Sequence, residues 1–298
     1  MSVPMAYIGV IIIWSTTPLA VFWSSEEVGF IFGLTSRMLI GAVLATMAVA
    51  LMGIGLHWNK TAVRLYIITG FSFFMAMFLI YWAMQYIPTG WVSLLYGFMP
   101  IATALMARRW LEGEALGRYK ILGLSIGLIG LSCVFSTGLD LNQGAVFGIG
   151  AVLLSVVLHA GSSVWVKKQA ANLPSIVLTS GGLLVATPLF LMAFFLSGAT
   201  IPEHASVKTM WSIFYLALFG SVLGFALYYY VLKHVDATRA SLITLIAPIA
   251  ALGFGNVLNH EPLTAGIILG AMLILGGLSL FEFGHWVPKL FRRAYKQK

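Results

Sequence analysis

The chain has 298 residues, of which 60% are hydrophobic and only 9% are charged, and its formal net charge is +8. Soluble globular domains carry roughly 25% charged residues, so this composition excludes an ordinary water-soluble domain. The single cysteine, Cys133, excludes an intramolecular disulfide and a cysteine-based metal cluster. The basic residues are scattered between apolar runs and do not form one face with aromatic residues, which argues against nucleic acid as a partner.

Ten apolar segments follow one another along the chain, and each is long enough to cross a membrane as a helix. A helix needs about 20 apolar residues to cross the hydrocarbon layer. In chain order the segments are 4–23, 29–53, 64–85, 90–110, 118–137, 143–166, 174–198, 210–232, 237–259 and 262–281. They are too long for ordinary strands, and a lipid environment permits only helices or closed barrels. The sequence therefore predicts an all-α integral membrane protein with ten transmembrane helices in a lipid bilayer.

The connections between these segments differ in charge. If the N-terminus is cytoplasmic, all of the 17 lysines and arginines except Arg37 and Lys208 lie on the cytoplasmic side, as the positive-inside rule requires. Residues 1–22 have no basic n-region and no small-residue cleavage site, so we expect the first segment to be retained. We predict a multi-pass protein of the cytoplasmic (inner) membrane, with both termini in the cytoplasm.

The sequence contains an internal duplication. Residues 79–100 align with residues 227–248 at a constant offset, which places Tyr81 over Tyr229 and Pro100 over Pro248. The alignment predicts two five-helix repeats, residues 1–139 and 140–284, followed by a basic cytoplasmic tail, residues 285–298. Because five is odd, the second repeat must enter the membrane in the opposite sense. Inverted repeats of this kind are typical of secondary transporters, in which the substrate binds between the halves near the membrane midplane.

The chain resembles the drug/metabolite transporter superfamily, in its EamA-like family. The residues that carry the resemblance are Trp14-Ser15, Arg37, the run from Ala83 to Pro100, Glu114-Ala115-Leu116, Gly123 and Gly130, and, in the second copy, Ser241 to Pro248, Glu261-Pro262-Leu263, Gly270 and Gly277. The resemblance implies ten helices in two inverted repeats and the export or uptake of metabolites such as amino acids. The second copy departs from the first, with Gly181 near the position of Arg37 and His159 near that of Trp14.

Two ionisable residues lie deep within spans. A charged group at mid-span costs about 2.5–3.5 kcal/mol on insertion scales, so Arg37 needs a partner or a polar cavity. A substrate carboxylate is one candidate partner, and snorkelling or pairing with helix-end carbonyls is the alternative. His159 titrates near neutral pH in water and is a candidate for proton coupling, although a hydrogen-bonded core histidine is the more common arrangement.

Aromatic residues and prolines complete the candidate site. Seven aromatic residues lie in spans that the resemblance places around a central cavity, namely Trp14, Tyr81, Trp82, Tyr96, Trp165, Tyr229 and Tyr230. They can stack on an aromatic or cationic substrate, or they can belong to the belts that Trp and Tyr form at membrane interfaces. Each of Pro18, Pro100 and Pro248 frees a carbonyl that can face a cavity, and each can bend its helix during gating; a packing kink is the alternative.

Other patterns have structural explanations. The acidic residues Glu112, Glu114 and Glu261 lie at span ends, where a carboxylate stabilises a helix start. The run from Gly123 to Gly127 matches a nucleophile-elbow pattern, but it lies inside a predicted span, where glycines four residues apart favour close helix packing. The leading hypothesis is a secondary transporter, without a cofactor, that exports an amino acid or related metabolite. Uptake or exchange of a sugar-like or nucleotide-linked solute, an intramembrane enzyme and a non-transporting scaffold are the alternatives.

Overall fold

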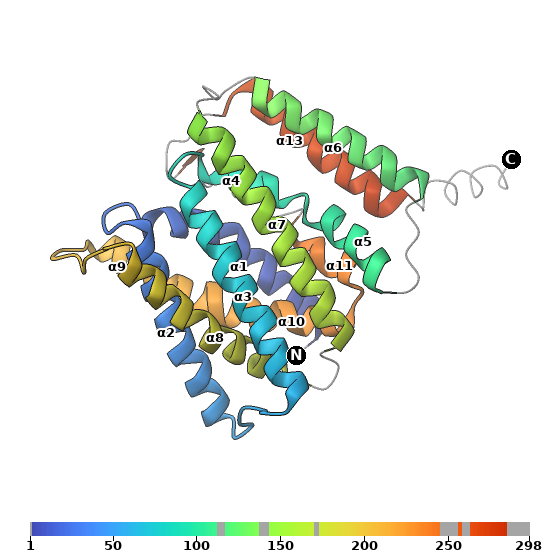
Figure 1. Ribbon diagram of the computed structural model, residues 1–298. Coiled ribbons are helices and arrows are strands. Elements are labelled where there is room, and N and C mark those ends of the chain that lie inside the picture. Colours follow the sequence, from blue (N-terminus) through green and yellow to red (C-terminus); the bar gives the residue numbers. More distant parts are fainter. Residues whose placement is uncertain are drawn as a thin grey trace, which may run out of the picture.

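The computed structural model describes residues 2–111, 117–136, 143–169, 173–244, 256–257 and 263–284. Within these ranges every regular element is a helix (Figure 1). Seven helical stretches among the described residues are long and apolar enough to cross a membrane. The all-α prediction is therefore confirmed for the described part of the chain.

The first half of the chain forms helices α1 to α6. Their bounds are α1 (Val3–Trp23), α2 (Phe30–Leu51), α3 (Lys60–Ala83), α4 (Thr89–Tyr96), α5 (Met99–Trp110) and α6 (Arg118–Ser136). The fourth predicted span is divided in two, since α4 ends at Tyr96 and α5 begins at Met99. Pro100 lies in the first turn of α5, where its missing N–H leaves no helical hydrogen bond unmade. This proline therefore marks a helix start and not a kink within a continuous helix.

The second half forms α7 to α13. Their bounds are α7 (Gln143–Gln169), α8 (Ser175–Leu196), α9 (Val207–Tyr215), a π-helical segment η1 (Leu216–Leu223), α10 (Gly224–His234), α11 (Ala237–Ser241) and α13 (Ala265–Phe283). The eighth predicted span is thus one continuous helical stretch, formed by α9, η1 and α10, with a π-helical segment in its middle. Short π-helical segments are rare and occur frequently at functional sites.

Helices of the two halves pack against one another. Helix α1 packs on α10, α2 on α8 and η1, α3 on α7 and α8, α5 on α7 and α11, and α6 on α13. Figure 1 shows α6 and α13 side by side along one edge of the molecule. Their contact depends on glycine, because a Cβ on Gly123 would overlap the carbonyl oxygen of Gly277, and a Cβ on Gly277 would lie 2.7 Å from the backbone nitrogen of Gly127. The predicted close packing at these glycines is confirmed.

Several sequence predictions fall on residues outside the described ranges. These are the helix-start roles of Glu112, Glu114 and Glu261, the kink at Pro248, most of the ninth span and the basic tail 285–298. They stay predictions.

Candidate functional site

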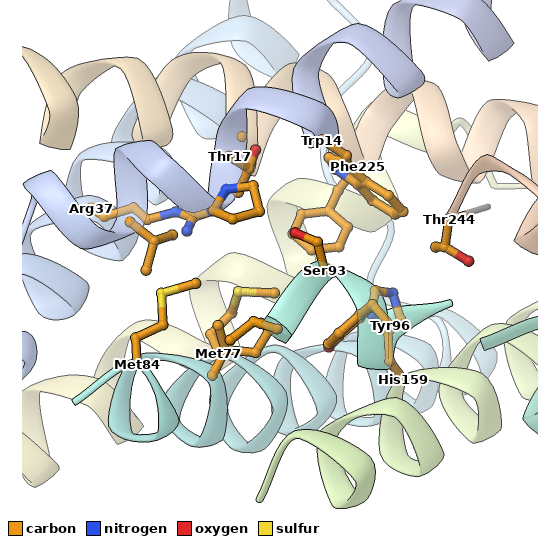
Figure 2. A pocket seen from close by; sticks show the side chains of 15 residues that line it. Trp14, Thr17, Arg37, Met77, Met84, Ser93, Tyr96, His159, Phe225 and Thr244 are labelled. Carbon is orange, nitrogen blue, oxygen red and sulfur yellow. The ribbon is translucent and has the colours of Figure 1, made fainter. Parts of the chain in front are cut away.

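A cavity of about 90 Å³ lies between the two halves. Its lining comes from α1, α2, α3 and α4 in the first half of the chain and from α7, η1, α10 and the residues after α11 in the second half. The lining residues are Trp14, Thr17, Pro18, Val21, Arg37, Met77, Ile80, Met84, Val92, Ser93, Tyr96, His159, Gly220, Phe225 and Thr244. Figure 2 shows Arg37 at one end of this cavity and Tyr96 and His159 toward the other, with Met77 and Phe225 between them.

Arg37 projects from α2 and is almost fully buried, with 1% of its surface exposed. Its Nε donates a hydrogen bond to Ser221 Oγ at 2.9 Å, and its Nη1 donates to the hydroxyl of Tyr81 at 3.4 Å. The ion pairs found among the described residues do not include Arg37. The side chain does not snorkel and makes no hydrogen bond to a helix-end carbonyl in the described part of the chain. It is a buried cation held by two neutral hydroxyl groups.

The π-helical segment η1 determines what surrounds this cation. Ser221 supplies the shorter hydrogen bond, and the neighbouring Gly220 leaves room for the guanidinium. A Cβ on Gly220 would lie only 2.9 Å from Arg37 Nη2. The guanidinium carries five N–H groups, and two of them donate to Ser221 and Tyr81. The others make no hydrogen bond within the described part of the chain, so they are candidate contacts for a ligand or for water.

His159 has the opposite kind of environment. It projects from α7 with 4% exposure, and neither ring nitrogen has a hydrogen-bond partner among the described residues. Four aromatic rings surround the imidazole, with centroid distances of 6.0 Å to Trp14, 6.3 Å to Tyr96 and 5.8 Å to both Phe225 and Tyr228.

The tyrosine hydroxyls of this cage are engaged elsewhere. The Tyr96 hydroxyl lies 2.6 Å from Ser155 Oγ, and the Tyr228 hydroxyl donates to Ser163 Oγ at 2.9 Å. Both serines lie on α7, the helix that carries His159. The hydroxyls are therefore turned to α7, and the imidazole is left with ring faces and edges as neighbours. Because buried polar groups are seldom left unsatisfied, the two ring nitrogens are candidate contacts for a ligand or water.

The structure brings together some of the sequence-predicted site residues and separates others. Trp14, Pro18, Arg37, Tyr96 and His159 line the cavity, and Tyr81 contacts Arg37 behind the lining.

The remaining predicted residues lie away from this cavity. Trp82 packs on Tyr86, Trp165 packs on Trp110 and under the guanidinium of Arg64, Tyr229 lines a separate pocket with Lys167 and Lys233, Tyr230 packs on His234, and Pro100 begins α5.

Sequence reasoning missed several residues at the site. Gly220 and Ser221 lie in an apolar run with no charged or aromatic signal, and their importance depends on the π-helical turn that presents them to Arg37. Phe225 and Tyr228 are aromatic residues of the same span as Tyr229, so the span could be identified but not the ring that faces the cavity. The signal that could have found Ser221 is the need of a mid-span arginine for polar neighbours on an adjacent helix.

Comparison with known proteins identifies the family. The EamA-like transporter family matches the chain twice, over residues 2–136 and 146–283. The uncharacterized transporter YoaV of Bacillus subtilis (strain 168) is 28% identical over 283 residues, which cover 94% of this chain and 97% of that protein. A protein of Salmonella typhimurium named "Probable amino-acid metabolite efflux pump" is 26% identical over 69% of this chain and 71% of its own length.

A protein of Escherichia coli (strain K12) with the same name is 25% identical over 66% of this chain and 68% of its own length. A solved structure, titled only "Crystal structure of protein", shares the fold with a TM-score of 0.71 at 19% identity, over 95% of this chain and 97% of that one. The relatives are named transporters and not enzymes, which agrees with a helical chain rich in apolar spans. The chain is a multi-pass membrane protein and belongs to the EamA-like transporter family.

Proposed function

We propose that the chain is a secondary transporter that moves a small organic metabolite across the cytoplasmic membrane by alternating access, with amino acids as the leading substrate class and export as the leading direction. The observation that carries this proposal is the cavity between the halves, which is lined from both and contains a buried cation. A site between two halves can be exposed to either side when one half rocks against the other. A non-transporting scaffold predicts a packed interior near Arg37 and His159, and the cavity argues against it.

The proposed architecture has ten transmembrane helices in two inverted repeats, residues 1–139 and 140–284, with both termini and the tail 285–298 in the cytoplasm. Two observations support the repeats. The family matches the chain once in each half. The helix contacts are also reciprocal: α1 packs on α10 as α7 packs on α3, and α2 packs on η1 as α8 packs on α3. A two-fold relation between the halves produces this reciprocity.

Support for an amino acid or related compound comes from the relatives and from the cavity. The two relatives named amino-acid metabolite efflux pumps each match about two thirds of the chain. In the cavity, Arg37 provides a partner for a carboxylate, and the apolar surface provides a place for a side chain. Uptake or exchange of a sugar-like or nucleotide-linked solute is the alternative, and Arg37 could also bind a phosphate of the latter.

Movement requires helices that can bend and a source of energy. Pro18 lies within α1 at the cavity and is the proposed bending point there, with the break before Pro100 and with Pro248 as further candidates. His159 is the candidate for proton coupling, because its imidazole lines the cavity and an imidazole ring can bind and release a proton. If it carries the coupled proton, an imposed pH gradient will drive transport in the wild type and will not drive it in His159→Gln.

Counterflow in proteoliposomes tests the proposal. Vesicles with the full chain are loaded with one unlabelled amino acid at a time and are then exposed to a trace of the labelled compound. We expect transient accumulation of the label for at least one amino acid, and no accumulation in vesicles without protein. If no amino acid exchanges although the reconstituted protein is folded, the proposed substrate class is wrong, and sugar-like and nucleotide-linked solutes become the next panel.

A further inference from the structure

Among the described residues that line it, the central cavity has a fixed positive charge and no negative one. The nine acidic residues of the chain lie in connections or near span ends, at Glu26, Glu27, Glu112, Glu114, Asp140, Glu203, Asp236, Glu261 and Glu282. The cavity lining contains none of them. Arginine stays protonated at any pH that a folded protein tolerates. The ligand that completes this site must therefore supply the negative charge.

We infer that the cavity recognises a carboxylate with an apolar or aromatic body, and that it does not require the amino group of an amino acid. This inference rests on the proposed transport of an amino acid or related metabolite and names the substrate class more narrowly. The preferred ligands are monocarboxylates, including deaminated amino acids, and zwitterionic amino acids are tolerated. Amines without a carboxylate are rejected.

The carboxylate end of the site is organised before a ligand arrives. Ser221 from η1 and Tyr81 from α3 hold the guanidinium of Arg37 in one orientation. Both partners are neutral, so the cation keeps its full charge in a buried place. A guanidinium matches the two oxygens of a carboxylate in a bidentate arrangement, which gives both strength and geometric selectivity. Because Arg37 belongs to one half and Ser221 to the other, a carboxylate bound here also contacts the boundary between them.

The rest of the cavity offers an ammonium group no ionic partner. Between Arg37 and His159 the lining includes the apolar side chains of Met77 and Phe225, and the polar side chains there, Thr17 and Ser93, carry only neutral hydroxyl groups (Figure 2). Imidazole is neutral or positive, so His159 adds no negative charge. Pro18 lacks an N–H, which leaves the carbonyl of Trp14 without its helical donor and able to accept a hydrogen bond. An ammonium would meet neutral hydroxyl groups, this carbonyl dipole and aromatic faces, which permit its binding but supply no negative charge to offset its desolvation.

A matched series of four ligands tests the inference, because all four carry the same phenyl side chain. They are phenylalanine, 3-phenylpropanoate, phenylalaninamide and 2-phenylethylamine. The purified full chain is titrated with each ligand, and its thermal stabilisation is recorded; the same compounds then compete in counterflow. We expect 3-phenylpropanoate to bind at least as tightly as phenylalanine, and the amide and the amine to bind about tenfold more weakly or worse. Arg37→Gln should remove this ranking, whereas Arg64→Gln, which changes an arginine outside the cavity, should retain it.

The outcomes separate this inference from the proposed function. If labelled phenylalanine or another amino acid exchanges but the amide or the amine competes as well as the carboxylates, transport stands and carboxylate recognition is wrong. If phenylalanine binds more than tenfold tighter than 3-phenylpropanoate, the amino group is required and the inference is equally overturned. If none of the four ligands stabilises the chain and no amino acid exchanges, both proposals fail. The ranking in the wild type decides the matter even if Arg37→Gln does not fold, and Arg37→Lys then serves as the second variant.

Discussion

The crossing of α2 with η1 and the crossing of α8 with α3 occupy equivalent places in the proposed repeat, yet their contents differ. The first contains Arg37, whose guanidinium donates a hydrogen bond to Ser221 and lies close to Gly220. The second contains Gly181 and the ring of Tyr66, and a Cβ on Gly181 would overlap that ring. The crossing of α8 with α3 is thus a close contact between glycine and an aromatic ring, and the crossing of α2 with η1 holds a buried cation beside a cavity. A duplicated scaffold can keep its helix arrangement while a single crossing acquires the binding chemistry.

Of the substitutions that test this comparison, removal of the Arg37 cation should have the largest effect on ligand affinity. In Arg37→Gln the carboxylate loses its charged partner, and we expect the apparent affinity in counterflow to fall by about 30-fold or more, which corresponds to about 2 kcal/mol. Arg37→Lys keeps the positive charge but lacks the planar guanidinium that can bind both carboxylate oxygens, so an intermediate loss of affinity of about tenfold is expected. Gel filtration and thermal unfolding of each variant control for folding. A glutamine variant that retains the wild-type affinity would show that the cation is structural.

At the crossing of α8 with α3, a change of glycine to alanine should lower the stability of the protein and leave its ligand affinity unchanged. Gly181→Ala forces the ring of Tyr66 away from α8, and overpacking of this kind costs about 1–3 kcal/mol. We expect a lower melting temperature of the full chain and an unchanged ranking of ligands. Gly150→Ala is the matched control, because a Cβ on this glycine of α7 would meet nothing within 4 Å. Equal melting temperatures of the two variants would contradict the close contact at Gly181.

At the crossing of α2 with η1, a change of glycine to alanine should lower the ligand affinity and leave the stability nearly unchanged. In Gly220→Ala the new methyl group would lie 2.9 Å from Arg37 Nη2, while its next neighbour, a Leu216 methyl carbon, is at 3.5 Å. The guanidinium is the end of a flexible side chain and can yield, so stability should change little. Its displacement should weaken carboxylate binding by several-fold, or about 1 kcal/mol, in the ligand titration. A variant that unfolds at a much lower temperature but binds normally would argue against this.

The sequence predicts the helices and the charged centre of the site better than it predicts the orientation of the side chains. Long apolar runs identify membrane helices because a bilayer demands a minimum length, and Arg37 is visible because a charge at mid-span is costly. The rotation of a helix about its axis leaves no such signal. Tyr81 contacts Arg37 while its neighbour Trp82 packs on Tyr86. Of the three consecutive tyrosines of α10, the ring beside His159 is that of Tyr228, and the sequence prediction named only Tyr229 and Tyr230.

The sequence also does not predict where the helices break or where a helical turn widens. Pro100 is compatible with a helix start or with a bend inside a helix, so it does not by itself predict the division between α4 and α5. The structure places it in the first turn of α5. The π-helical segment η1 contains ordinary apolar residues, so its wider turn has no compositional signature. These local departures from a regular helix place Ser221 and Gly220 at the cation. A single sequence does not predict these departures, because they depend on packing between helices that are far apart in the sequence.

The smallest predicted effect concerns a contact between the halves outside the spans. Glu27, in the connection between α1 and α2, accepts hydrogen bonds from the Ser206 backbone N–H at 2.8 Å and from Thr209 Oγ1 at 3.1 Å, where α9 begins. The bond from the Ser206 N–H is the main reason that the pKa of the Glu27 carboxyl lies below its ordinary value. The nearby charged groups are Glu26 and Lys208, which form an ion pair at 3.2 Å.

A lowered pKa means that the folded state favours the carboxylate. Its contribution to stability is therefore complete above the ordinary pKa of glutamate, near 4.5, and is lost as the pH falls through the lower pKa of the folded protein. We expect the wild type to melt slightly above Glu27→Gln at neutral pH and the two melting temperatures to converge below pH 4.5. Glu203→Gln, a change in the connection between α8 and α9, serves as the control. A difference between Glu27→Gln and the wild type that widens on acidification would have the wrong sign for a carboxylate that caps α9, and would show that this contact does not tie the two halves together.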